Sequence, residues 1–185
     1  MRWTQDSSNF LRQITQRYMM NVTTIAVISD THAYLDPRIA DIIRESDIAI
    51  HAGDICSSHI LKDMRPKTGK VYAVAGNNDI APHFAEIPAE LEIALPGGKI
   101  AVEHGHLHGM QKPSHASLRK KHPQAKVIIY GHTHKMLQDK TELPWVINPG
   151  AAGKTRTRGG PSCLTVRCED DTWEITEHRF TEENL

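Results

Sequence analysis

The chain contains five apolar segments of strand length, and each ends in a short loop that carries Asp, Asn or His. The first segment, residues 22–29, is a β-branched run followed directly by Asp30, Thr31 and His32. In an extended chain residues i and i+2 point the same way, so we predict that Asp30 and His32 face one point beyond the strand. In open α/β folds ligands bind at that end of the strands.

The first half of the chain alternates between strands and helices. Apolar periodicity and turn residues predict, in order, strands over 22–29, 48–51 and 70–75, and helices over 37–45 and from Ser57 or Ser58 to about Met64. The first helix has Asp36 at its N-cap and Pro37 in its first turn. This alternation is typical of a parallel sheet with right-handed crossovers.

The second half is richer in strands. The pattern predicts a hairpin of strands 91–95 and 99–103, a helix over 114–122, strands over 127–130, 136–140 and 145–148, and a closing hairpin of 163–168 and 172–179. One α/β domain with two packed sheets, over residues 21–185, is the simplest architecture. We treat residues 1–20 as an N-terminal extension that is either helical over 10–20 or disordered, with a natural start at Met19 or Met20 as the alternative.

Charge and cysteine content exclude several classes of protein. Basic and acidic residues both number 22, which argues against a dominant nucleic-acid or membrane-surface role. The three cysteines form no CxxC pair, so neither a disulfide framework nor a zinc ribbon is indicated, and a cytoplasmic setting is expected. No apolar run approaches the roughly 18 residues that would cross a membrane. The twelve histidines are unusually many, and histidine is the commonest metal ligand.

The strand-end residues form a potential ligand set. It comprises Asp30, His32, Asp54, Asn77, His104, His132 and His134. Carboxylate, amide and imidazole groups together suit Mn²⁺, Fe or Zn²⁺ better than Ca²⁺. Seven groups are too many for one tetrahedral ion but fit two ions bridged by a carboxylate, about 3.5–4 Å apart, which would clamp a phosphorus ester for in-line attack.

Each segment alone has a plainer interpretation. Gly53-Asp54 and Gly76-Asn77 are also ordinary turn chemistry, and a single Asp or His at a strand end is commonly a cap. The pair His132 and His134, separated by one residue after Gly131, is the most specific element. The order and common placement of all five segments favour the metal hypothesis over five separate turns.

These motifs carry a family resemblance. In order, they are Asp30-x-His32, Gly53-Asp54, Gly76-Asn77-x-Asp79, His104-Gly105-His106 and Gly131-His132-x-His134. The set resembles the calcineurin-like metallophosphoesterase superfamily, and in its short length the small single-domain prokaryotic phosphodiesterase branch. The resemblance covers roughly residues 23–180. It implies a four-layer α/β/β/α sandwich of two mixed sheets with flanking helices.

The resemblance also implies roles for individual residues. Asp30, His32 and His134 would hold one divalent ion, Asn77, His104 and His132 would hold the other, and Asp54 would bridge them. A hydroxide between the ions would attack the phosphorus, because bound metals lower the pKa of water toward ~7. Mn²⁺ is the expected ion, with Fe, Zn or Ni as alternatives.

The chain departs from the family pattern after Asn77. Many relatives have His where this chain has Asn78, and an amide cannot act as a general acid. Asn78 is therefore predicted only as a substrate contact, and His106 is our candidate proton donor, with a structural histidine as the alternative. Asp79 is expected to orient a ligand or its loop, or simply to stabilise the turn.

The expected function is that of a metal-dependent phosphoesterase, preferably a phosphodiesterase, acting on a small phosphodiester or phosphomonoester. A non-catalytic scaffold or interaction module on the same fold, like the retromer subunit that resembles these enzymes, is the alternative. A nuclease ranks last, because the chain is short and neutral. No stable nucleic-acid complex and no membrane association are expected, and the oligomeric state is left open.

Overall fold

The computed structural model describes residues 22–181, so the expected extension over residues 1–20 lies outside the described part. The strands are β1 (Val22–Ile28), β2 (Ile48–His51), β3 (Lys70–Ala73), β4 (Glu90–Leu95), β5 (Gly98–Glu103), β6 (Val127–Ile129), β7 (Leu137–Asp139), β8 (Trp145–Asn148), β9 (Ser162–Glu169) and β10 (Thr172–Arg179). The helices are α2 (Pro37–Glu45), α3 (Ser58–Asp63), α4 (His115–Lys121) and the 3₁₀ turns η1 (Pro82–Phe84) and η2 (His106–His108).

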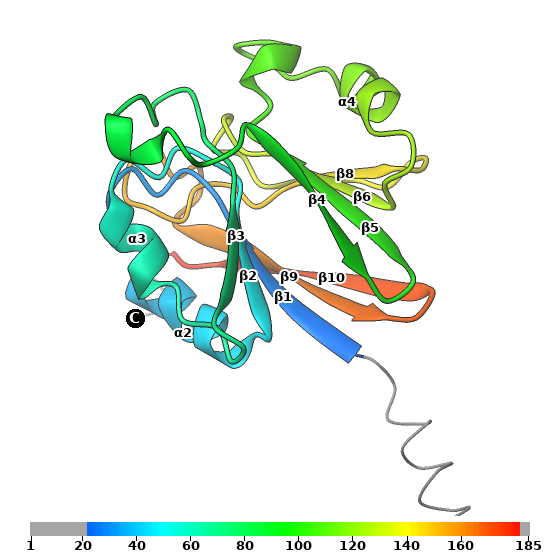
Figure 1. The fold of residues 1–185 in the computed structure, drawn as a ribbon, viewed down its shortest axis with the longest axis horizontal. Helices are drawn as coiled ribbons and strands as arrows, with labels where there is room; N and C mark the ends of the chain where they lie inside the picture. Colours follow the sequence, from blue (N-terminus) through cyan, green and yellow to red (C-terminus); the bar gives the residue numbers. More distant parts are fainter. Residues whose placement is uncertain (1–21, 182–185) are drawn as a thin grey trace, which may run out of the picture.

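The strands form two mixed sheets of five. The first has the order β10-β9-β1-β2-β3, and the second has the order β4-β5-β6-β8-β7 (Figure 1). In the first sheet β1, β2 and β3 are parallel, with Ile25 paired to Ile48 and Ile48 to Lys70. In the second sheet β5, β6 and β8 are parallel. Hairpins supply the antiparallel strands at the sheet edges.

The two sheets pack face to face, with helices on their outer sides. Alternate residues of β1 separate the layers: Ile25 and Val27 enter the core between the sheets, whereas Ala26 and Ile28 pack toward α2 and α3. Leu118 of α4 covers the outer face of the second sheet. Figure 1 shows α2 and α3 on one side and α4 on the other. The expected four-layer α/β/β/α sandwich is therefore confirmed.

Local signals explain why the helix boundaries match the sequence pattern. The side chain of Asp36 accepts a hydrogen bond from the Arg38 amide at 3.0 Å, and Pro37 occupies the first turn of α2. Ser114 caps α4 in the same way, by accepting from the amide of Ser117. Caps satisfy amides that have no partner inside the helix, so they mark where a helix can begin.

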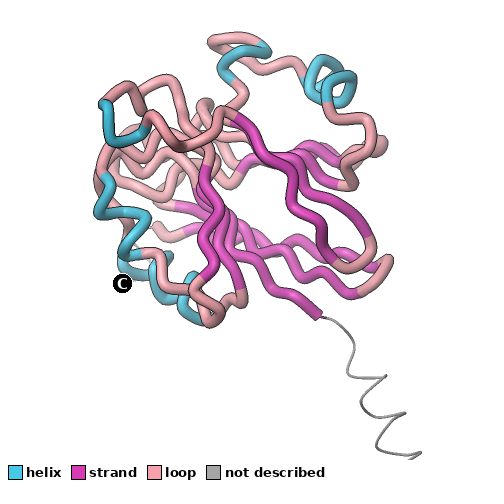
Figure 2. The backbone as a smooth tube through the Cα atoms, in the orientation of Figure 1, coloured by secondary structure: helices cyan, strands magenta, loops and turns pink. Residues whose placement is uncertain are grey.

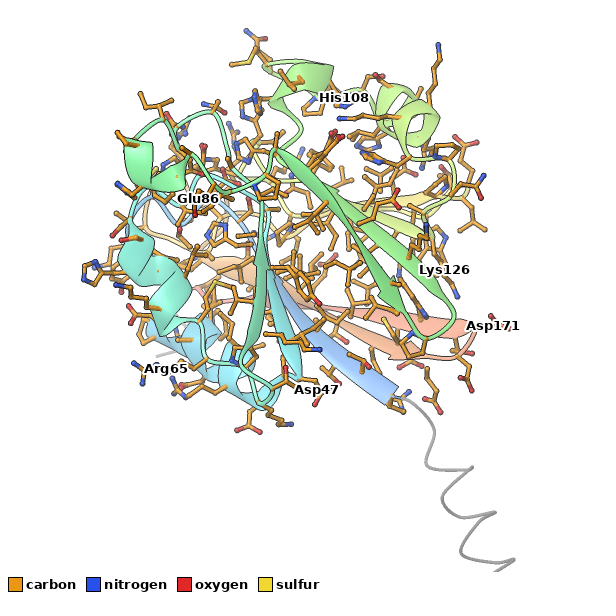
Figure 3. The ribbon with its side chains drawn as sticks, in the orientation of Figure 1. Asp47, Arg65, Glu86, His108, Lys126 and Asp171 are labelled. Atoms are coloured by element: carbon orange, nitrogen blue, oxygen red, sulfur yellow. The ribbon has the colours of Figure 1, made fainter. Side chains whose placement is uncertain are left out.

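Two hairpin turns join the sheets at the end remote from the predicted site. Gly97 has φ of +77°, and a Cβ there would lie 1.4 Å from the carbonyl oxygen of Asp170, so only glycine permits this approach. The ammonium of Lys126 donates to the carbonyls of Gly97 (3.2 Å) and Asp171 (2.7 Å). Figure 3 labels Lys126 and Asp171 at these turns. The contact fixes how one sheet lies on the other.

The carboxyl ends of the parallel strands meet on the opposite side of the molecule. Figure 2 shows the loops, in pink, gathered beyond the strands there. The loops after β1, β2 and β3 are joined by backbone hydrogen bonds, including Asp30 N–H to the Gly53 carbonyl at 3.0 Å. β3 ends at Ala73, two residues before the predicted boundary, because the Ala75 amide turns to the carbonyl of Pro88. Within residues 22–181, no helix has the length and apolarity to cross a membrane.

Candidate metal centre

All seven predicted ligand residues lie in loops at this end of the strands. Three are almost wholly buried, with Asp30, Asp54 and His104 between 0 and 1% exposed, and His134 is 3% exposed. His32, Asn77 and His132 are half-buried. Burying two carboxylates is costly unless a positive charge or hydrogen bonds compensate them. The site therefore has the composition of a cation-binding centre.

Four side chains form one compact cluster. Asp30, His32, Asp54 and His134 each offer one ligand atom, and these four atoms lie within 4.8 Å of one another. Nε2 of His134 is 3.3 Å from Oδ1 of Asp30 and 3.1 Å from Nε2 of His32. Two imidazole nitrogens this close would otherwise have to share one proton, whereas a cation between them uses both lone pairs.

The remaining predicted ligands, Asn77, His104 and His132, lie on the side of Asp54 opposite His32. Nε2 of His104 is 3.3 Å from Oδ1 of Asp54, while Oδ2 of the same carboxylate is 3.7 Å from Nε2 of His32. The ring of His132 is 5.2 Å from that of His104, and Asn77 and His132 line one cavity with Asp54. Asp54 thus stands between the two groups, each of its oxygens facing one of them.

Backbone carbonyls fix which ring nitrogen carries the proton on three of the histidines. Nδ1 of His104 lies 2.7 Å from the Ala52 carbonyl, and Nδ1 of His134 lies 2.9 Å from the Thr155 carbonyl. Nε2 of His132 lies 2.6 Å from the Met110 carbonyl. A carbonyl only accepts, so these nitrogens carry the protons and the opposite nitrogens carry lone pairs, as metal-ligating histidines do.

Several buried polar atoms in this part of residues 22–181 have no hydrogen-bond partner. They are both carboxylate oxygens of Asp30, Oδ1 of Asn77, Nε2 of His104 and Nδ1 of His106. An unpartnered buried acceptor costs about 1–3 kcal/mol, more when charged. Four of these atoms belong to predicted ligands, and coordination to a cation would satisfy them where no hydrogen bond from the described residues does.

The backbone that presents these ligands is not extended, which corrects one prediction. Asp30 and His32 have φ of +53° and +44°, and His132 and His134 have φ of +68° and +55°. They converge because the loop turns through left-handed conformations, and not because they alternate along a strand. Left-handed backbone is unfavourable for residues other than glycine, and such strain is concentrated at functional sites.

Glycines let the ligand loops touch one another. A Cβ on Gly76 would lie 2.2 Å from Oδ1 and 2.3 Å from the backbone nitrogen of Asp54. A Cβ on Gly53, whose φ is +94°, would lie 2.6 Å from Nδ1 of His104. Both contacts are shorter than any real Cβ contact, so a side chain at either position would displace a predicted ligand.

Replacing Gly76 tests this close approach. We expect Gly76→Ala to lower the free energy of unfolding by about 3 kcal/mol, because the added methyl overlaps the Asp54 backbone. Gly69→Ala is the control, since a Cβ there meets nothing within 4 Å and adds only left-handed strain of about 1 kcal/mol. Urea unfolding of both variants gives the two values. Equal losses would show that Gly76 is not crowded.

Burial and neighbouring charge shape the protonation of the central pair. Burial by itself raises the pKa of Asp54, but the neighbouring imidazole of His104 and the hydrogen bonds donated by Asn78 hold that pKa well below its ordinary value. Burial lowers the pKa of His104, yet the adjacent carboxylates of Asp54 and Asp30 raise it overall. The site thus favours a positive charge beside Asp54, which a proton or a metal cation can supply.

Asp79 and Asn78 stand behind and beside the central carboxylate. Asp79 accepts from the backbone amides of Gly76 (2.8 Å), Ile55 (3.1 Å) and Cys56 (2.8 Å), and so ties the loop after β3 to the loop after β2. Asn78 donates to Asp54 from its backbone amide (2.9 Å) and from its side chain (2.6 Å). The two residues hold Asp54 in place.

His106 and Cys56 both lie next to predicted ligand histidines. The His106 ring lies 5.5 Å from that of His104 and 6.1 Å from that of His132, and burial lowers its pKa. His106 does not line the cavity that opens over the ligand cluster, whereas Asn78 does. Cys56 is half-exposed in a left-handed part of the loop, with φ of +60°, and its Sγ lies 3.5 Å from Nδ1 of His32.

A cavity of about 600 Å³ opens over the cluster. Its lining residues are Asp54, Asn77, Asn78, Met110, Gln111, His132, Thr133, Arg156 and Arg158. Arg156 and Arg158 come from the loop between β8 and β9, and Nη2 of Arg156 lies 3.1 Å from Nε2 of His134. Spacing along the chain holds no signal for this contact, since it depends on the fold bringing the loop back.

Comparison with known proteins agrees with the geometry. Residues 23–171 match the family model described as the calcineurin-like phosphoesterase superfamily domain. A probable metallophosphoesterase of Bacillus subtilis is 31% identical over 152 residues, which cover 80% of this chain and 85% of that protein. A phosphodiesterase of Methanocaldococcus jannaschii is 28% identical over 142 residues, which cover 68% of this chain and 82% of that protein.

Solved structures share the fold. A single mutant of Vps29 from Entamoeba histolytica superposes with a TM-score of 0.69 at 19% identity, covering 85% of this chain and 99% of that one. At this identity the likeness establishes the fold alone.

Proposed function

This chain belongs to the calcineurin-like phosphoesterase superfamily, and we propose that it is a phosphodiesterase that works with two divalent metal ions. The observation that carries the proposal is the set of buried, unpartnered ligand atoms on both sides of Asp54. Coordination to cations would satisfy them together. The relative from Methanocaldococcus jannaschii, described as a phosphodiesterase, supports the preference for diesters.

The ligands divide between two positions. Asp30, His32 and His134 would hold one ion, and Asn77, His104 and His132 would hold the other, with Asp54 shared between them. Bound divalent ions would supply Lewis-acid chemistry there, lowering the pKa of water and neutralising charge on the phosphoryl group. The mixed nitrogen and oxygen donors suit Mn²⁺, with Fe, Zn and Ni as alternatives.

Side chains around the cavity would position the substrate. Arg156 and Arg158 line it, and Arg156 contacts the ligand cluster at His134, so the two guanidinium groups would bind phosphoryl oxygens. The Asn78 amide lines the same cavity and would contact the substrate directly. His106 remains our candidate for donating a proton to the leaving oxygen, with water from the open cavity as the alternative donor.

Metal-dependent hydrolysis tests the proposal. The purified full chain should release p-nitrophenolate from bis-p-nitrophenyl phosphate when Mn²⁺ is added, and should lose this activity in excess chelator. Activity should return when Mn²⁺ is restored, which excludes unfolding as the cause of the loss. A folded chain that is inactive with Mn²⁺, Fe²⁺, Zn²⁺ and Ni²⁺ alike would overturn the proposal.

A non-catalytic interaction module is the second candidate, because the fold is shared with Vps29 of Entamoeba histolytica. All seven positions here hold side chains able to coordinate a metal, and four of them are at most 3% exposed. A module without catalysis has no need to keep a buried carboxylate, that of Asp30, without hydrogen-bond partners. This composition favours the enzyme, and the hydrolysis assay separates the two candidates.

A further inference from the structure

A second cavity opens beside the one above the ligand cluster. It has a volume of about 290 Å³ and shares Gln111, Thr133 and Arg158 with the first cavity. The remaining lining residues are Lys112, Pro113, His115, Tyr130, Lys135 and Leu137. The shared wall means that one molecule could lie across both cavities with its phosphorus in the first.

Part of the wall of the second cavity is apolar, and contacts between its side chains hold it in place. Tyr130 is 3% exposed, and its ring meets the His115 ring edge-on at 5.7 Å. The phenol oxygen lies 3.2 Å from Nε2 of His115, whose Nδ1 lies 2.7 Å from Oδ2 of Asp139. Pro113 and Leu137 add aliphatic surface. A wall held in this way suits a flat apolar group such as an aromatic ring.

The rim of the second cavity is cationic. Lys112, Lys135 and Arg158 are exposed at the rim, and no carboxylate belongs to the lining that residues 22–181 provide. The nearest acidic group behind the wall, Asp139, is already paired with His115 and with Arg119, whose Nη2 lies 3.0 Å from it. The three cations are therefore available to an anionic ligand, and cations of this kind bind phosphate.

We propose that the second cavity binds one ester arm of the substrate, and that this arm carries an aromatic ring and a further phosphate group. The inference rests on the proposed phosphodiesterase function and names its substrate class: a nucleotide-like phosphodiester with a second phosphate. The scissile phosphorus would lie in the first cavity, the ring against Pro113 and Leu137, and the second phosphate among the lysines. The shared Arg158 can contact either phosphate.

A binding experiment without turnover tests the second cavity directly. The probe is thymidine 3′,5′-bisphosphate, titrated calorimetrically into the full chain in a chelating buffer, with thymidine and inorganic phosphate as references. We expect the bisphosphate to bind at least about tenfold more tightly than either reference, because ring and phosphate contacts act together. Binding no tighter than that of inorganic phosphate would overturn the inference.

Variants test whether the bisphosphate binds in the second cavity or is attracted to positive charge elsewhere on the surface. The double variant Lys112→Ala, Lys135→Ala should weaken binding of the bisphosphate about tenfold, through the loss of two charge-assisted contacts. Lys120→Ala removes an exposed lysine of α4 that does not line the cavity, and it should leave the affinity unchanged. All three lysines are exposed, so the variants should fold. An equal loss in both proteins would overturn the inference.

Hydrolysis distinguishes this inference from the function on which it rests. The p-nitrophenyl ester of thymidine 5′-phosphate is compared, with added Mn²⁺, with the same ester bearing a 3′-phosphate. We expect a higher kcat/KM for the second, and a loss of this preference in the double lysine variant. Hydrolysis of both esters without preference would overturn the inference and leave the proposed function standing. Binding of the bisphosphate without hydrolysis of any ester would support the cavity as its site but overturn the phosphodiesterase proposal.

Discussion

Asp54→Ala is expected to abolish phosphodiesterase activity and to prevent binding of both metal ions. Each oxygen of Asp54 faces a different ligand group, at 3.3 Å from His104 and 3.7 Å from His32. A metal ion contributes several kcal/mol to stabilising the transition state, and every 1.36 kcal/mol is a factor of ten in rate. Loss of both ions should therefore lower kcat/KM for bis-p-nitrophenyl phosphate by at least about 10³-fold.

Two measurements check this expectation. Elemental analysis of the variant, loaded with Mn²⁺ and desalted, should find much less than one ion per chain, against two in the unaltered protein. Asp63→Ala is the matched control, because Asp63 is an exposed aspartate at the end of α3. It should keep both ions and full activity. Two ions in Asp54→Ala would refute the bridging role even if activity fell.

His32→Ala is expected to remove one metal ion and keep the other. His32 belongs to the cluster with Asp30 and His134, whereas His104 and His132 lie on the other side of Asp54. We expect affinity for Mn²⁺ to fall at least about 100-fold at one position only. Activity should fall strongly as well, because in-line attack on phosphorus uses both ions.

A metal titration followed by calorimetry distinguishes one position from two. The unaltered chain should give two binding events and His32→Ala one, while His59→Ala, which removes an exposed histidine of α3, should still give two. Loss of both events in His32→Ala would show that the two positions are not separable. In that case the assignment of ligands to two ions would be wrong.

The agreement between sequence and structure is closest where local interactions decide the conformation. The helix predicted over 37–45 is observed as Pro37–Glu45, because the Asp36 cap and Pro37 define its start without help from distant residues. The strand predicted over 145–148 is observed as Trp145–Asn148. The family resemblance is confirmed as well, since its motifs are short and ordered along the chain.

Agreement is weaker where distant segments meet. The predicted i, i+2 geometry of Asp30 and His32 was wrong, because left-handed backbone is imposed by loops that bond to one another. The pairing of His115 with Asp139 and Tyr130 had no signal in the sequence. The sequence pattern also did not predict the contact of Nε2 of His108 with Oε1 of Glu103, at 2.6 Å.

The sequence by itself determined which chemical groups end the strands, since strand periodicity, glycine turns and the order of Asp, Asn and His are written locally. The tertiary structure alone decided how these groups meet. His32 and His134 are 102 residues apart, yet their Nε2 atoms lie 3.1 Å from each other. It also brought Arg156 to His134 and opened the second cavity beside the first. Such contacts depend on the packing of two sheets, and no spacing along one chain segment encodes that distance.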